Sequence, residues 1–390
     1  MQPEHEPHRR KATPMTERKK STTRKGERPM KRSVVRDDAP VPALATSHAR
    51  QHPAPDLGPL HDPGFAGARE RAEQMGADRA PIVNLPSGGQ IRVGTAGWTD
   101  PTLTAPGVFY PKGMTSAEAR LKYYASLFPL VEVDSTYYAL PARRMAELWA
   151  ERTPDDFTFN LKAHALMTGQ PTEVSRLPTE IRDALPDELA EKRRIYGKDL
   201  PPELYDEVWR SFADAIEPLR SSGKLGAVLL QYPRWFMPNR ANTDAILEAR
   251  ERLGDIPVAV EFRNQLWLDG RHGERTLGFL EEHDLPFVMV DEPQGTAASV
   301  PPIAAATSPQ LAMLRMHGRR KDLWTKPNAT VTERFRYLYD AKELEQWVPK
   351  VEDIARTVAE THVIFNNCYG NYGTTNALEM GKLLQDTAHG

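Results

Sequence analysis

Ionisable side chains stand at alternate positions in several short apolar segments of this sequence. Glu132 lies between two valines, Glu261 lies between Val260 and Phe262, and His317 ends a segment that begins at Leu311. We predict that Glu132, Glu261 and His317 are catalytic. Two carboxylates in different environments have separated pKa values, and such a pair suits general acid–base hydrolysis or isomerisation.

A second set of polar and aromatic residues is predicted to bind the substrate. The cations in this set would hold an anionic group or a developing negative charge. The amides would orient hydroxyl groups, and the two tryptophans would stack on a sugar or a base. The set is Trp98, Asp134, Lys162, Gln231, Arg263, Trp267, Asp291, Arg315, Asn366 and Asn367.

Eight β-rich segments alternate with helical stretches and must position these residues. Strands alternating with helices favour a parallel sheet with crossover helices, and eight of them suit a closed (β/α)8 TIM-type barrel. An open, doubly wound α/β sheet is the alternative. Long connections at 166–201 and 292–310 are predicted to be loops at the mouth. The predicted strands are Ile91–Thr95, Leu130–Asp134, Phe157–Ala163, Ala227–Tyr232, Val258–Arg263, Phe287–Asp291, Leu311–His317 and Val363–Asn367. The predicted helices are 116–127, 143–152, 202–221, 243–252, 273–283, 341–359 and 376–387.

The alternation within the strands predicts which residues share a face. Successive side chains of a strand point to opposite sides, and helices cover the outside of a barrel. The apolar residues must then point outward, and the charged residues point inward near the carboxyl ends of the strands. Barrel enzymes build their active sites at that end. The competing interpretation is an internal salt-bridge network that only closes the barrel.

Residues 1–89 differ in charge and in hydrophobic pattern from residues 90–390. The first forty residues hold twelve Lys and Arg against six Asp and Glu, which leaves a net charge of −8 for the rest of the chain. We predict a disordered basic tail over residues 1–89, with a short helix at Gly67–Gln74 as an option, and a barrel domain over 90–390. Only the tail would contact nucleic acid, because the barrel domain is acidic.

Composition limits the metal sites and the cellular compartments that can be expected for this protein. The sequence has one cysteine, Cys368, so a disulfide within the chain and a cysteine-based metal site are excluded. No apolar run is long enough to cross a membrane, and the first residues lack the apolar core of a secretory signal. We therefore expect a cytoplasmic protein without a membrane partner.

Seven ordered motifs resemble the YecE-like family, also called domain of unknown function 72. The motifs are Gly94–Trp98 with Phe109-Tyr110-Pro111, Val131–Tyr138, Leu161-Lys162-Ala163, Leu230–Pro233, Val260–Arg263, Arg315–Gly318 and Phe365-Asn366-Asn367. The resemblance covers about Ile91 to Leu384 and implies a TIM-type barrel, but no established activity. Two positions depart from the pattern: Cys368 follows the paired Asn where the family commonly has Asp, and Thr168-Gly169 replaces a Thr-His.

These observations leave three functions open. The first is an enzyme of the hydrolase or isomerase type that acts on a polar or anionic small substrate, such as a sugar, a sugar phosphate or a nucleotide. The second is a binding module that captures a small anionic ligand or a nucleic-acid end without turnover. The third is an enzyme dependent on a divalent metal held by Glu132, Glu261, Asp291 and His164 or His317. Lysine and arginine in the same layer disfavour the metal, so no cofactor is expected. The oligomeric state is left open.

Overall fold

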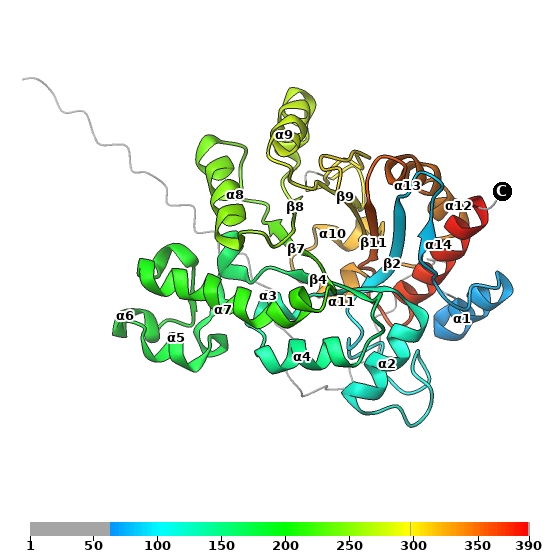
Figure 1. Ribbon diagram of the computed structural model, residues 1–390, viewed down its shortest axis with the longest axis horizontal. Helices are drawn as coiled ribbons and strands as arrows, with labels where there is room; N and C mark the ends of the chain where they lie inside the picture. The colour runs from blue at the N-terminus through cyan, green and yellow to red at the C-terminus, as the bar shows by residue number, and fades with distance from the viewer. Residues whose placement is uncertain (1–62, 297, 389–390) are drawn as a thin grey trace, which may run out of the picture. The chain divides into compact units, whose positions relative to one another are not determined.

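The computed structural model describes residues 63–296 and 298–388, and in them eight parallel strands form a nearly closed barrel (Figure 1). The neighbours run in the order β8-β7-β4-β3-β2-β11-β10-β9. Val260 of β8 pairs with Phe287, and the Val260 amide donates to the Pro286 carbonyl over 2.8 Å, which joins the two ends of the sheet. The predicted (β/α)8 architecture is confirmed. The strands are β2 (Gln90–Ala96), β3 (Leu130–Val133), β4 (Thr158–Lys162), β7 (Leu225–Tyr232), β8 (Val258–Phe262), β9 (Val288–Asp291), β10 (Leu311–Met316) and β11 (Glu360–Phe365).

Helices surround the strands, and local signals explain where several of them begin (Figure 1). Ser116 caps the helix that follows it by accepting the Ala119 amide, and Asn239 accepts the Asn242 amide in the same way. The helix predicted over 341–359 is two helices, because Pro349 lacks an N–H group and lies in the first turn of a new helix. The helices are α2 (Ala117–Leu127), α4 (Arg143–Glu151), α7 (Pro202–Ser221), α8 (Arg240–Leu253), α9 (Gly270–Glu282), α12 (Ala341–Glu345), α13 (Val348–Ala355) and α14 (Tyr372–Ala388).

The structured part of the chain begins before residue 90. Helix α1 (Gly64–Gln74) occupies the region where a short helix was an option, and Arg71 forms an ion pair of 2.6 Å with Glu379 of α14. Strand β1 (Val83–Asn84) then pairs antiparallel with β2. The boundary predicted at residue 89 is therefore corrected for residues 63–89. The predicted disorder of residues 1–62 lies outside the described residues.

The two long connections differ from each other. Residues 166–201, predicted as a loop, contain a small two-stranded sheet, β5 (Thr172–Glu173) with β6 (Arg194–Ile195), and the short helices α5 (Thr179–Asp183) and α6 (Asp187–Ala190). Residues 292–310 contain neither a helix nor a strand among their described positions. Within the described residues, no helix is long and apolar enough to span a membrane.

The apolar core lies between the barrel and its helices. Val131, Phe159 and Leu314 are fully buried and belong to one cluster with helix residues such as Phe212 of α7. Each such side chain contributes roughly 1.5–3 kcal/mol when it leaves water. The amino-terminal end of the interior is polar instead: Asn160 Nδ2 lies 3.2 Å from His362 Nδ1. The outward direction of the apolar residues leaves the barrel interior to the polar ones.

Candidate functional site

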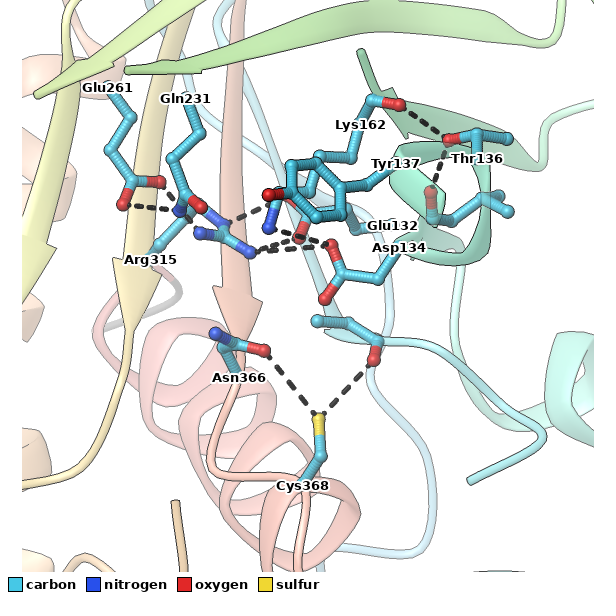
Figure 2. A network of polar contacts seen from close by, with 12 residues as sticks. Glu132, Asp134, Thr136, Tyr137, Lys162, Gln231, Glu261, Arg315, Asn366 and Cys368 are labelled. Atoms are coloured by element: carbon cyan, nitrogen blue, oxygen red, sulfur yellow. Dashed lines mark hydrogen bonds and ion pairs between the residues drawn. The ribbon is translucent and has the colours of Figure 1, made fainter. Parts of the chain in front are cut away.

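Arg315 of β10 joins two buried carboxylates from opposite sides of the barrel interior (Figure 2). Its Nε donates to Glu132 Oε2 over 3.0 Å, its Nη2 donates to Glu132 Oε1, and its Nη1 donates to Glu261 Oε2 over 2.7 Å. None of these three side chains is exposed to solvent. A buried guanidinium must be paired in this way, because an isolated charge is costly in a low-dielectric interior.

Glu261 is surrounded by donors on its other oxygen as well. Gln231 Nε2 donates to Oε1 over 2.8 Å, Arg263 Nε lies 2.7 Å from the same atom, and His317 Nε2 lies 3.4 Å away. Burial alone would raise the pKa of Glu261, but the charges of Arg263 and Arg315 hold this pKa well below its usual range. Glu261 is therefore a permanent anion whose oxygens are already occupied.

Glu132 has the opposite electrostatic balance. Burial raises its pKa to about 7, although the charge of Arg315 opposes the shift. Asp134, two residues further along the chain, adds a second negative charge that favours the protonated form of Glu132. The two buried glutamates thus differ in protonation behaviour, as the sequence analysis expected of an acid–base pair, but both are sealed from solvent.

Lys162 and Asp134 are two members of this network that reach solvent. Their side chains are 13% and 30% exposed, and Lys162 Nζ lies 3.9 Å from Asp134 Oδ1. The Lys162 amine also lies 4.6 Å from the centre of the Tyr137 ring. Burial lowers the pKa of Lys162, and Asp134 opposes this effect. Figure 2 shows the two side chains on the same side of Arg315.

His317 and Asn366 extend the network toward β11. Asn366 Nδ2 lies 3.0 Å from His317 Nδ1, and His317 is fully buried. Burial and the neighbouring charge of Arg263 lower the pKa of His317 to about 3. The ring is therefore neutral near pH 7 and carries no positive charge toward an anionic substrate.

Asp291 requires a correction. It pairs in register with Met316, on the outer face of the sheet, and accepts hydrogen bonds from Arg319, Tyr339 and Trp347 Nε1. It anchors the surrounding segments and does not face the interior. The neighbouring Glu292, which the sequence analysis missed, is buried and accepts a hydrogen bond of 2.9 Å from Arg263.

Three further predicted substrate-binding residues lie away from the network. Trp98 packs edge-on against Trp149 at 5.8 Å, within the core. Trp267 stacks on Phe262 at 4.4 Å, and Asn367 donates to the Tyr337 carbonyl and to Asn376. All three are buried. The structure therefore corrects their predicted role: Trp98 and Trp267 serve packing, and Asn367 fixes the entry to α14.

Other residues near the mouth of the barrel lie outside the strands, so the alternation within the strands could not predict them. Gln170, in the long connection after β4, accepts the Tyr137 hydroxyl over 2.9 Å and donates to Thr168 Oγ1 over 3.0 Å. Thr168 begins the Thr168-Gly169 pair that replaces the Thr-His of the family pattern. Beyond β7, the guanidinium of Arg234 lies 5.9 Å from the Trp324 ring and, within the described residues, makes no ion pair.

The residues considered for a divalent metal are not arranged as one ligand set. Asp291 faces the helices, while Glu132 and Glu261 are bonded to Arg315. In the described part of the chain, no three His, Cys, Asp or Glu side chains are placed to hold a metal ion. Cys368 donates weakly to the Ala96 carbonyl over 3.3 Å, and burial raises the pKa of its thiol well above the usual value.

Comparisons with known proteins agree with this architecture. Residues 92–390 match the family model described as "Protein of unknown function DUF72". The UPF0759 protein YunF of Bacillus subtilis (strain 168) is 31% identical over 297 residues, which cover 75% of this chain and 94% of that protein.

Solved structures give the same result. A DUF72 family protein from Thermotoga maritima MSB8 is 31% identical, with a TM-score of 0.60 over 76% of this chain and 99% of the other. A DUF72 family protein from Enterococcus faecalis V583 is 26% identical, with a TM-score of 0.58 over 76% of this chain and 98% of the other. Through its family match, its sequence identity to YunF and its barrel, this chain belongs to the DUF72 family.

Proposed function

We propose that this protein is an enzyme that acts on a polar or anionic small substrate at the carboxyl end of its barrel. One observation carries the proposal: Lys162 and Asp134 reach solvent at the ends of adjacent strands, close together but without a hydrogen bond between them. A network that served only to close the barrel would be expected to pair such groups at hydrogen-bond distance.

We propose different tasks for the predicted catalytic residues. Glu132, Glu261 and His317 have no exposed surface, so we propose that they position the residues above them. Asp134 and Lys162 would contact the substrate and transfer protons, which supports either hydrolysis or isomerisation. The same pair would serve a sugar, a sugar phosphate or a nucleotide.

Arginines near the mouth support an anionic substrate. Arg263 is 15% exposed, and both Arg263 and Arg234 lie 5.9 Å from the Trp324 ring. Glu292 bonds Arg263, whereas Arg234 has no carboxylate partner among the described residues. Arg263 also pairs with Glu261, so Arg234 is the guanidinium whose charge a phosphate or carboxylate group of a substrate would neutralise.

The test is a ligand screen followed by substitution. Thermal unfolding would be measured with sugars, sugar phosphates, nucleotides and divalent ions, and a ligand of the folded state should raise the melting temperature with dose. Arg234→Gln should weaken the response to anionic compounds. Arg240→Gln, which removes an exposed charge that is only 3.8 Å from Asp244, is the matched control.

Turnover of the ligand distinguishes an enzyme from a binding module. Asp134→Asn should abolish conversion of the identified ligand but leave the shift in melting temperature largely intact. Binding without conversion by the wild-type protein would favour the binding module, and the absence of any stabilising ligand would contradict both. As part of this proposal we place the protein in the cytoplasm, because its one cysteine is a free thiol and free thiols persist in reducing compartments.

A further inference from the structure

The amine of Lys162 lacks the bonds that a buried lysine normally makes. Its side chain is 13% exposed, and in the described part of the structure its Nζ makes no hydrogen bond. The nearest carboxylate oxygen is Asp134 Oδ1 at 3.9 Å. The backbone at this position is held in place, because Thr136 Oγ1 donates to the Lys162 carbonyl over 2.5 Å (Figure 2).

The carboxylate beside Lys162 also has an oxygen that is buried without a hydrogen bond. Asp134 Oδ1 has no hydrogen bond, and it lies 3.8 Å from Arg315 Nη2 as well as 3.9 Å from Lys162 Nζ. Buried polar atoms are normally satisfied, so Asp134 Oδ1 indicates the place of a ligand.

We propose that Lys162 Nζ is a nucleophile that forms a Schiff base with the carbonyl group of an aldehyde or ketone substrate that carries an anionic group. This inference rests on the proposed function and specifies its substrate class. Asp134 first takes a proton from the Lys162 ammonium. The amine lone pair then forms a bond to the carbonyl carbon, and the C=O π electrons move to oxygen.

The remaining steps release one water molecule. A proton passes from nitrogen to oxygen to give the neutral carbinolamine. The Asp134 carboxyl then returns its proton to the departing hydroxyl, the C–O bond breaks, and the nitrogen lone pair forms the C=N bond. The products are a protonated imine, water and the Asp134 carboxylate. No oxidant, reductant or metal is needed for this sequence.

The surroundings favour the neutral amine that this reaction needs. Burial lowers the pKa of Lys162, and the fixed charge of Arg315 acts in the same direction. Lys224 offers an internal comparison, because burial also lowers its pKa. Its Nζ, however, donates to the Ala150 carbonyl over 2.7 Å and to the Thr153 carbonyl over 2.8 Å. A lysine held by two carbonyl oxygens should not add to an aldehyde.

The experiment traps the Schiff base by reduction. The full-length protein is incubated at neutral pH with glycolaldehyde phosphate or with glycolaldehyde, each with sodium cyanoborohydride, and modified lysines are mapped by peptide mass spectrometry. Each adduct adds the mass of the aldehyde less one oxygen atom. We expect about tenfold or more adduct on Lys162 than on exposed lysines, because burial lowers the pKa of Lys162 and the neutral amine is the form that adds to the carbonyl group.

Variants of the protein and a comparison of the two aldehydes test the inference further. Lys224 should stay unmodified, the phosphorylated aldehyde should label Lys162 more than the neutral one, and Asp134→Asn should slow labelling by about a hundredfold. Lys224→Arg should leave Lys162 labelling unchanged. Labelling of Lys162 no greater than that of exposed lysines would overturn the inference. If anionic ligands still raise the melting temperature in that case, the proposed function stands without the Schiff base.

Discussion

Replacing Arg315 by methionine tests whether the buried network depends on its central guanidinium. The substitution leaves Glu132 and Glu261 buried while removing the donor that bonds both. Breaking a buried ion pair by removing one partner costs about 3–5 kcal/mol. Glu261 keeps Arg263 and Gln231, so most of the loss arises at Glu132. We therefore expect the lower end, about 3 kcal/mol, and a melting temperature lower by roughly 6–12 °C.

The loss should grow with pH. In the wild-type protein the pKa of Glu261 is held well below its usual value, so the stability it contributes is present above the unfolded pKa and is lost only as the pH falls. Without Arg315, the pKa of Glu132 rises further above its present value of about 7. A carboxyl with a raised pKa loses its stabilising contribution as the pH rises, and both proteins lose it in parallel up to about pH 7, so the variant should fall further behind wild type as the pH rises above about 7.

Urea unfolding of both proteins at acidic and mildly alkaline pH measures this difference. Arg252→Met is the matched control, because Arg252 bonds Asp206 and Glu248 at the surface and should cost no more than about 1 kcal/mol. A loss at Arg315 as small as that of the control, or a loss that does not change with pH, would refute the reasoning.

Other substitutions probe separate features. Glu132→Gln removes a group whose pKa of about 7 lies above its ordinary value of 4.5. The stability of this variant relative to wild type should therefore rise by up to about 3 kcal/mol between pH 5 and 8. A constant difference in urea unfolding would contradict the raised pKa. Asp291→Asn should lower the melting temperature through about 2–3 kcal/mol of weakened hydrogen bonds, yet leave Lys162 labelling unchanged. Gly94→Ala places a Cβ 2.0 Å from the Leu130 carbonyl oxygen, so calorimetry should show a loss of about 1–3 kcal/mol or more; unchanged stability would mean that the interior is wider there.

The sequence predicted the barrel and most of the inward-facing charges because alternation is unambiguous in mixed strands. Glu132 between valines and Arg315 between Leu314 and Met316 each have one possible face in a sheet covered by helices. Strand β9 differs, because Val288, Met289 and Val290 are all apolar. Its face is set by pairing with β10, where Val290 lies beside Arg315. Without that register, Asp291 and Glu292 could not be distinguished.

Local pattern also could not place the aromatic residues. Trp98 and Trp267 follow strand ends, a position equally suited to ligand stacking and to packing against the helices. Their contacts with Trp149 and Phe262 depend on how the segments fold back onto the sheet. Trp324 lies in a connection without strand alternation, so sequence reasoning had no basis for placing it near Arg234.

Satisfied charges inside the barrel limit where chemistry can occur. Inside the barrel, Ala96, Leu130 and Ile364 form a small apolar cluster, and toward the amino-terminal end Asn160 Nδ2 already lies 3.2 Å from His362 Nδ1. Arg315 has its donors directed at two carboxylates, and an anion that displaced them would leave both carboxylates buried and unpaired. A substrate must therefore be recognised above this layer, where Lys162 and Asp134 keep unused bonding capacity. The buried network then acts through position: it holds a fixed positive charge beside an amine whose reactivity depends on being neutral.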